Sequence, residues 1–208
     1  MLLKAKHNFF IYPFFQWYAL WKINKVFHKV ELVGKFESTE RSILVLPNHI
    51  GWWDGFWIMY LNLKLLHKKF HFMMLHEQLQ RFWFFNYTGA FSVQKGSRSI
   101  IETLKYTAEI LNNNHNMVFV FPQGKICSLH QKPIFFEAGI EKILRYTKSN
   151  ITILFVANLI DYYSNPKPSL YIHLHEYTNS NLSTKAMEDA YNQFYNEAVF
   201  FQTQKEQA

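Results

Sequence analysis

"SILVLPNHIGWWDGFWIMYLNLKLL", residues 42–66, is a short apolar run, a turn and a second, longer apolar run. The first part, residues 42–47, is aliphatic and ends at a proline, which predicts a buried strand. Residues 52–66 carry apolar side chains at helical spacing, which predicts a helix. A strand that turns directly into a helix is typical of α/β domains.

His49 and Asp54 lie in the connection between these two elements. Near neighbours on a helix are three or four residues apart, so a separation of five places side chains on different faces. An odd separation along a strand places them on opposite faces. The two side chains therefore meet only if the backbone turns between them, and Gly51 has the conformational freedom for such a turn.

A carboxylate that reached one imidazole nitrogen of His49 would fix the tautomer and leave the other nitrogen free to accept a proton. It would also stabilise the imidazolium that forms on proton transfer. With a substrate hydroxyl bound beside it, His49 would act as a general base for attack on an acyl carbonyl. The alternative is that His49 is a packing residue and Asp54 only complements the positive N-terminus of the helix.

The rest of the chain alternates between the same two patterns. Apolar runs bounded by turn residues predict strands at 30–36, 42–47, 70–75, 90–93, 117–122 and 151–160, and an edge strand at 168–177. Helical spacing predicts helices at 52–66, at 97–113 from an N-cap at Ser97 to a stop at Asn112–Asn114, at 136–147, and at 183–202 with an N-cap at Ser183. The expected fold is a single α/β domain with a mixed central sheet flanked by helices and preceded by an aromatic amphipathic N-terminal helix.

Composition narrows the class of partner. The 208 residues are 49% hydrophobic and 19% aromatic, with a formal net charge of +7. The positive charge favours an anionic partner, and the many aromatic side chains favour a lipid interface over a nucleic acid. One cysteine, Cys127, permits no intramolecular disulfide and suits a reducing cytosol.

Residues 1–27 are expected to form a membrane-interface helix ahead of an acyl-transfer domain at 28–208. The apolar run 9–20 is interrupted by Pro13 and Gln16 and is shorter than the roughly 20 residues that span a bilayer. Aromatic residues followed by lysines are typical of a helix that lies in the interface. The sequence therefore predicts a peripheral or monotopic protein on the cytoplasmic face of a membrane. The alternative is a helix that covers the domain's own core.

Four blocks along the chain together carry a family resemblance. They are the His-four-residues-Asp motif in NHIGWWD (48–54), GAFSVQKGS (89–97), FPQGKICS (121–128) and FFEAGIEKILR (135–145). In order and separation they resemble the glycerolipid and lysophospholipid acyltransferase family, of which the 1-acylglycerol-3-phosphate acyltransferases are familiar members. The corresponding family blocks after the first are Gly-x-x-Phe-x-x-Arg, Phe-Pro-Glu-Gly-Thr-Arg-Ser and Phe-Lys-x-Gly. The resemblance covers about residues 28 to 175.

The resemblance implies O-acyl transfer from an acyl-CoA or acyl carrier protein thioester to the hydroxyl of a lysolipid or other lipid alcohol. By resemblance, His49 is the general base and Asp54 orients it. The same resemblance assigns substrate binding to Lys95, Arg98, Pro122, Gln123, Gly124 and Lys125. It implies membrane lipids as partners and neither a cofactor nor a metal.

Two of these blocks depart from the family pattern. Gln123 and Lys125 stand where the family has glutamate and threonine, and Lys95 stands at the arginine of the second block. Lysine binds phosphate as a point charge and lacks the bidentate geometry of arginine. The acceptor therefore stays open between a lysophosphatidate and an aminolipid, a glycolipid or a pigment glycoside. Gln123 is alternatively a neutral replacement that only keeps a hydrogen bond.

Four other functions are weighed against this one. Cys127 could be a nucleophile activated by His49 and Asp54, although it falls at the family's serine position and a lone cysteine is more often an inert buried thiol. Metal binding would use His173 and His175 on one strand face with His71 and His76, but two histidines are half of a zinc site. Nucleic-acid binding lacks basic and aromatic residues interleaved along a groove. A catalytically inactive lipid-binding relative is the remaining alternative.

Overall fold

A central seven-stranded sheet organises the molecule. The structure, a computed structural model, describes residues 2–37, 40–96 and 99–205. The strands lie in the order β1-β7-β6-β2-β5-β3-β4. Their bounds are β1 Lys29–Val33, β2 Ile43–Pro47, β3 Lys69–Leu75, β4 Ala90–Val93, β5 Asn116–Phe119, β6 Thr152–Asp161 and β7 Ser169–Glu176.

Strand direction defines the edge of the sheet that matters. Strands β6, β2, β5, β3 and β4 are parallel to one another. Strand β7 runs antiparallel to β6, and β1 runs parallel to β7, so the sheet is mixed. The segments that follow β2, β5, β3 and β4 therefore all emerge at one edge, which is where open α/β sheets bind ligands.

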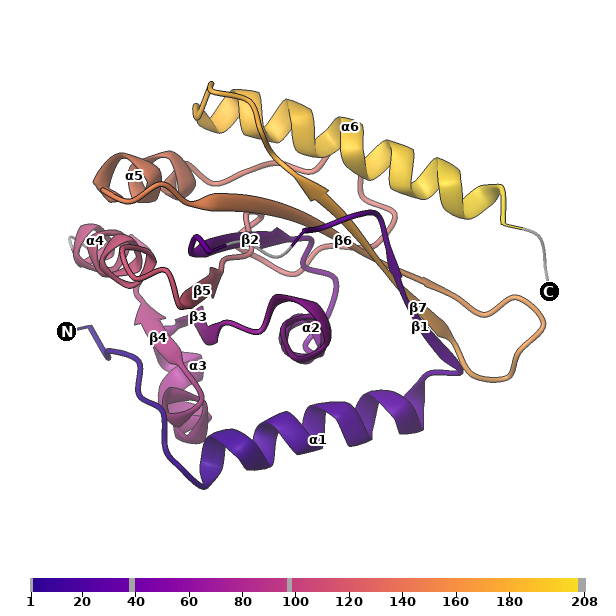
Figure 1. Cartoon of the computed structure of the whole chain (residues 1–208), viewed down its shortest axis with the longest axis horizontal. Coiled ribbons are helices and arrows are strands. Elements are labelled where there is room, and N and C mark those ends of the chain that lie inside the picture. The colour runs from indigo at the N-terminus through magenta and orange to yellow at the C-terminus, as the bar shows by residue number, and fades with distance from the viewer. Residues whose placement is uncertain (1, 38–39, 97–98, 206–208) are drawn as a thin grey trace.

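Helices cover both faces of the sheet (Figure 1). Side chains of α1 (Ile11–Val26), α2 (Asp54–Leu61) and α3 (His76–Arg81) pack into one core with the sheet. Side chains of α4 (Ile100–Leu111), α5 (Gly139–Tyr146) and α6 (Thr184–Thr203) pack into a second core on the opposite face. Strand β2 is buried along its whole length because it supplies side chains to both cores. The expected single α/β domain is confirmed.

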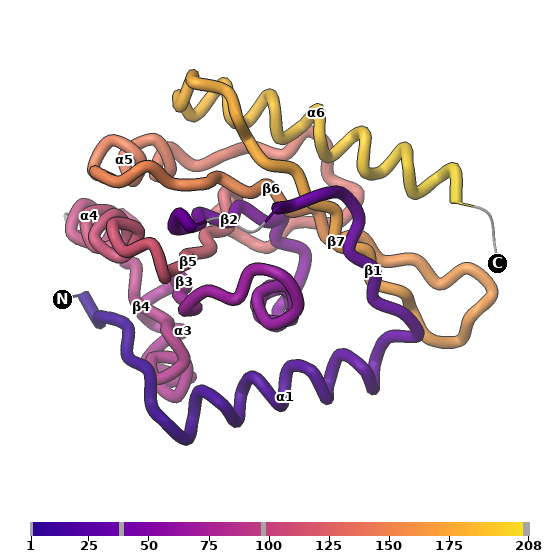
Figure 2. Tube along the Cα trace, in the orientation of Figure 1, coloured from indigo at the N-terminus to yellow at the C-terminus, as the bar shows by residue number. Residues whose placement is uncertain are grey.

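The N-terminal segment runs beside β4 before it enters α1 (Figure 2). The N–H of Gly89 donates to the carbonyl of Lys6 at 2.9 Å, and the N–H of Ser92 donates to the carbonyl of Leu3 at 3.0 Å. Helix α1 then buries Ala19 and Ile23 against the domain and turns large aromatic side chains outward. It therefore covers the core and also exposes an aromatic face. None of the helices in the described residues is long and apolar enough to span a bilayer.

Several predicted boundaries are wrong. Strand β7 is not an edge strand, because β1 pairs with it on the side away from β6. The predicted helix 52–66 is α2 followed by a π-helical segment, Asn62–Leu66. Helix α1 is Ile11–Val26, so residues 2–10 of the helix expected over 1–27 are not helical. The expected N-cap Ser97 lies outside the described residues, whereas Asn112 ends α4 and the hydroxyl of Ser183 caps α6 as predicted.

Candidate active site

The turn between β2 and α2 brings His49 and Asp54 together. Asp54 is the first residue of α2, and the chain reverses through residues 48–53. Nδ1 of His49 lies 2.8 Å from Oδ2 of Asp54. The same oxygen accepts the backbone N–H groups of Ile50 at 2.6 Å and Gly51 at 3.0 Å. The contact expected from the sequence is observed, and the turn that creates it is held by the carboxylate itself.

These contacts define the tautomer of His49. An ionised carboxylate can only accept hydrogen bonds, so Nδ1 of the imidazole carries the hydrogen and Nε2 has a free lone pair. The side chain of Asp54 is 0% exposed and that of His49 is 19% exposed. The buried carboxylate therefore acts on a ring whose other nitrogen faces accessible space, which is the arrangement of an oriented general base.

The loop that follows β5 supports His49 from three directions. The ring of Phe121 stacks on the imidazole with centroids 3.7 Å apart and planes 7° apart. Oε1 of Gln123 accepts the backbone N–H of His49 at 2.6 Å. The backbone N–H of Cys127 donates to the carbonyl of His49 at 2.8 Å. His49 is thereby fixed in position as well as in tautomer.

Behind the turn, a buried amide pair joins β2 to β6. Nδ2 of Asn48 donates to the carbonyl of Asn158 at 3.0 Å, and Oδ1 of Asn48 accepts the N–H of Asn158 at 2.7 Å. Nearby, Tyr191 of α6 donates its hydroxyl to the carbonyl of Val156 at 2.8 Å. Burial raises the pKa of Tyr191 well above its usual value, so this hydroxyl stays protonated and keeps donating. The end of β2 that positions His49 is therefore rigidly connected to the sheet.

A cavity of about 740 Å³ opens beside His49. This volume lies within the range of pockets that hold small ligands. Its wall is mostly apolar and comes from both cores. It includes Phe56, Met59, Phe70, Phe72, Phe85 and Phe119 on the side of α2, and Val93, Ile100, Leu104, Ile140 and Ile143 on the side of α4 and α5. The cavity suits a ligand with a long apolar part and a reactive group near His49.

Charged side chains stand at the polar part of this cavity. Nζ of Lys95 donates to the carbonyl of Gly124 at 2.7 Å and lies 3.3 Å from Oε1 of Glu137. Lys125 and Lys142 also line the cavity and are exposed. Gly124 has a φ of +62°, and a side chain there would meet Nζ of Lys95 at 2.7 Å, so this position requires glycine. These side chains give the rim of the cavity a net positive charge. Glu137 partly neutralises the charge of Lys95.

The predicted binding residues have different positions. Lys95, Pro122, Gly124 and Lys125 line the cavity. The carbonyl of Pro122 accepts the N–H of Glu137 at 2.8 Å. Gln123 is buried, and its side-chain oxygen accepts the backbone N–H of His49, as expected if it keeps a hydrogen bond; its role in substrate binding stays a prediction. Arg98 lies outside the described residues.

Sequence reasoning missed three residues of the site. Phe121 was read only as part of a motif, and its stacking on His49 depends on how two loops meet. Glu137 falls at the lysine of the family's Phe-Lys-x-Gly segment and pairs with Lys95, and Lys142 follows on the first turns of α5. Glu137 and Lys142 both fall in the motif block 135–145. The block indicates that the segment belongs to the site, but it does not show which of its side chains face the cavity.

The structure also places the residues of the rival functions. Cys127 is buried, its Sγ lies 3.7 Å from the carbonyl oxygen of Lys125, and the cavity wall includes its neighbour Ile126 instead. His173 and His175 lie on β7 and contact the rings of Phe201 and Phe194 of α6, with centroids 5.7 and 5.6 Å apart. Within the described parts of the chain, no three His, Cys, Asp or Glu side chains gather closely enough to hold a metal ion.

Comparison with protein families gives a match. A protein-family model described as Acyltransferase matches residues 22–157, which is more than half of the chain. The matched segment contains the β2–α2 turn, the loop after β5 and the cavity wall apart from Phe15, and it ends before β7 and α6. A search of curated proteins finds no match.

Proposed function

This chain belongs to the acyltransferase family, and we propose that it moves a fatty acyl group from a thioester to the hydroxyl of a lipid. The observation that carries the proposal is the 2.8 Å contact between His49 and Asp54 at the mouth of an apolar cavity. A base and its orienting carboxylate are present, and among the described residues no serine or cysteine lines the cavity beside them. The place of the nucleophile is therefore left to the substrate.

The reaction follows from this geometry. Nε2 of His49 takes the proton of the acceptor hydroxyl as its oxygen attacks the thioester carbonyl, and Asp54 stabilises the imidazolium. The tetrahedral intermediate then collapses, the carbon–sulfur bond breaks, and the leaving thiolate takes the proton from Nε2. The products are an ester and a free thiol, and His49 returns to its starting state.

The cavity and its rim suit the two ends of an acyl thioester. An acyl chain would contact the aromatic and methionine side chains of the wall, which favours a long chain over acetyl. Lys125 and Lys142 would meet the phosphates of the carrier, whether coenzyme A or the phosphopantetheine of an acyl carrier protein. Because Lys95 is engaged by Glu137, a phosphate on the acceptor would depend on the same two lysines among the residues that the structure describes. An acceptor with an uncharged or amino headgroup has no phosphate and would not need these lysines.

Transfer to a total lipid extract tests this function. Purified protein should move label from a long-chain acyl thioester to a lipid ester, more efficiently than from acetyl thioester, and the labelled product identifies the acceptor. Thioesters on coenzyme A and on acyl carrier protein are compared in parallel. If the protein binds the lipid but neither donor yields a labelled ester, it is an inactive lipid-binding relative.

We further propose that the protein works at a membrane surface. Eight large aromatic side chains are exposed on α1, on the segment before it, just before α2 and just after α3. We name them the exposed aromatic surface: Phe9, Phe10, Phe14, Trp17, Trp21, Trp52, Trp53 and Trp83. Nζ of Lys22 lies 5.1 Å from the ring centroid of Trp53, which joins α1 to the start of α2. Trp52 also lines the cavity, so the surface borders the site. Interfacial aromatic rings with nearby lysines are typical of proteins that lie on anionic bilayers.

Removing Trp17 and Trp21 tests this surface. These rings are 58% and 42% exposed and stack on each other, so Trp17→Ala with Trp21→Ala should leave the fold intact. Burying a large apolar side chain contributes about 1.5–3 kcal/mol, so even partial insertion predicts at least a roughly tenfold weaker partition onto anionic liposomes. The matched control is Phe200→Ala on α6, whose ring is 67% exposed on the opposite face of the sheet. Equal partition of wild type and the double variant in liposome sedimentation would contradict the assignment.

A further inference from the structure

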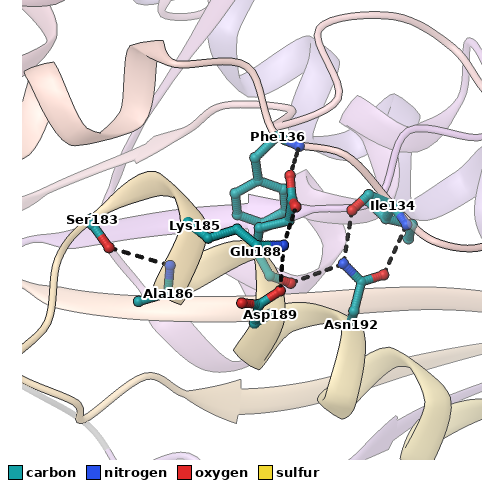
Figure 3. Close-up of polar contacts among 8 residues, drawn as sticks. All are labelled: Ile134, Phe136, Ser183, Lys185, Ala186, Glu188, Asp189 and Asn192. Atoms are coloured by element: carbon teal, nitrogen blue, oxygen red, sulfur yellow. Dashed lines mark hydrogen bonds and ion pairs between the residues drawn. The ribbon is translucent and has the colours of Figure 1, made fainter.

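Helix α6 contacts the loop after β5 through one row of side chains (Figure 3). Glu188, Asn192 and Tyr195 are spaced four and three residues apart, so they lie on one face of the helix. Oε2 of Glu188 accepts the N–H of Phe136 at 2.8 Å. Asn192 accepts the N–H of Ile134 and donates to its carbonyl, both at 2.8 Å.

The third member of the row extends the same contact. The hydroxyl of Tyr195 donates to the carbonyl of Leu129 at 2.9 Å. Burial raises the pKa of Tyr195 to about 12, so the hydroxyl remains a donor at any physiological pH. The three side chains bind the backbone of the loop, which makes the contact independent of most side chains in residues 129–136. We name residues 129–136 the clamped segment.

The clamped segment leads directly to the rim of the cavity. Glu137 follows it, donates its N–H to the carbonyl of Pro122 at 2.8 Å, and pairs with Lys95. Lys95 in turn holds the carbonyl of Gly124. A shift of Phe136 would therefore move Glu137 and, through it, the part of the rim formed by Lys95 and Gly124.

The start of α6 also anchors α5. Oε2 of Glu141 accepts the backbone N–H of Thr184 at 3.1 Å and the hydroxyl of Thr184 at 3.3 Å. The Thr184 N–H lowers the pKa of the Glu141 carboxyl, which agrees with a carboxylate held at a helix N-terminus. The next residue, Lys142, lines the cavity. The segments that carry Glu137 and Lys142 are thus both tied to α6.

We propose that Glu188 and Asn192 are positioning residues that set the rim of the acyl-thioester site through the clamped segment. The proposal rests on the proposed function for its kinetic consequence. Helix α6 lies outside the segment that the family model matches, so the motif blocks do not contain this device. The contact between His49 and Asp54 forms within the β2–α2 turn, which the clamp does not touch. Loss of the clamp should therefore impair thioester binding far more than the chemical step.

Asn192→Leu is the main test variant, because leucine has similar size and makes neither bond to Ile134. Losing this pair of partly buried hydrogen bonds predicts a KM for the acyl thioester that is roughly tenfold higher, with kcat changed less than about threefold. Glu188→Met should act in the same way. Glu188→Gln keeps an oxygen that accepts the Phe136 N–H and should restore a KM near that of wild type. A merely structural role would instead reduce the folded fraction, and apparent kcat with it, in Asn192→Leu and Glu188→Met.

Amide hydrogen exchange separates failure of the clamp from failure of the proposed function. In Asn192→Leu, exchange within residues 129–138 should rise at least roughly tenfold while β2 and β6 stay protected. Asp189→Ala is the control, since this neighbour on α6 pairs with Lys185 and leaves the loop contacts intact. If wild type transfers no acyl group, the exchange result alone decides whether the clamp exists. Unchanged exchange in this segment, or an unchanged KM in an active Asn192→Leu protein, overturns the proposal.

Discussion

Substituting His49 with alanine should lower the turnover of acyl transfer by about 10²–10⁴-fold, the range expected when a general base is lost. Within the β2–α2 turn, His49 is the side chain whose ring is oriented by a buried carboxylate and which also lines the cavity. The fold should survive, because residue 49 is held through its backbone by Gln123 and Cys127. Single-turnover transfer and circular dichroism on the same preparation measure both expectations.

His130→Ala is the matched control for this variant. His130 is an exposed histidine on the same loop that supports His49, and its backbone N–H bonds to the hydroxyl of Ser128. Its removal should leave the rate unchanged. A folded His49→Ala protein that transfers at the wild-type rate would refute the role of His49 as base.

Asp54→Asn should slow transfer by roughly 10²-fold and leave the protein folded. Two backbone N–H groups, from Ile50 and Gly51, point at the Oδ2 position and require an acceptor there. The amide oxygen of asparagine would take that position and still accept the hydrogen on Nδ1 of His49. The tautomer is therefore kept, and the loss comes from the missing negative charge that stabilises the imidazolium.

Asp54→Ala, compared with Asp54→Asn, separates two roles of the carboxylate: accepting the backbone N–H groups of the turn and stabilising the imidazolium. Alanine leaves the partly buried N–H groups of Ile50 and Gly51 without this acceptor, which costs up to about 1–3 kcal/mol for each donor. Asp54→Ala should thus lower the midpoint of thermal unfolding, whereas Asp54→Asn should not. If Asp54→Asn is fully active, the carboxylate has only the structural role.

The sequence was sufficient to predict features that depend on short stretches of chain. Alternating strands and helices identified the α/β class, and the odd spacing of His49 and Asp54 required a turn if the two side chains were to meet. The expected use of the conformational freedom of Gly51 is not observed, because its φ is not positive and an added Cβ would lie 3.8 Å from the nearest atom, Oδ1 of Asp54. The catalytic roles of the two residues stay a proposal until they are tested by substitution.

Features that depend on distant contacts were not predictable in the same way. The polar alternation of β7 suggested an edge strand, but β1 from the start of the chain pairs with its other side, and α6 covers the face that carries His173. The bond from Gln123 to the backbone of His49 and the pairing of Lys95 with Glu137 join residues far apart in the chain. The contacts of α6 with the clamped segment belong to the same class, since only the folded sheet brings that helix beside the loop.

The central claim is that His49 activates the lipid hydroxyl directly, without an acyl group on the protein. Rapid quench of a single turnover with a labelled acyl thioester and the lipid acceptor tests it, with wild type and Cys127→Ser compared. Label should pass from thioester to lipid ester at the same rate in both proteins, with none bound to protein at any time. Label trapped on Cys127 in wild type, together with loss of transfer in Cys127→Ser, would contradict the account.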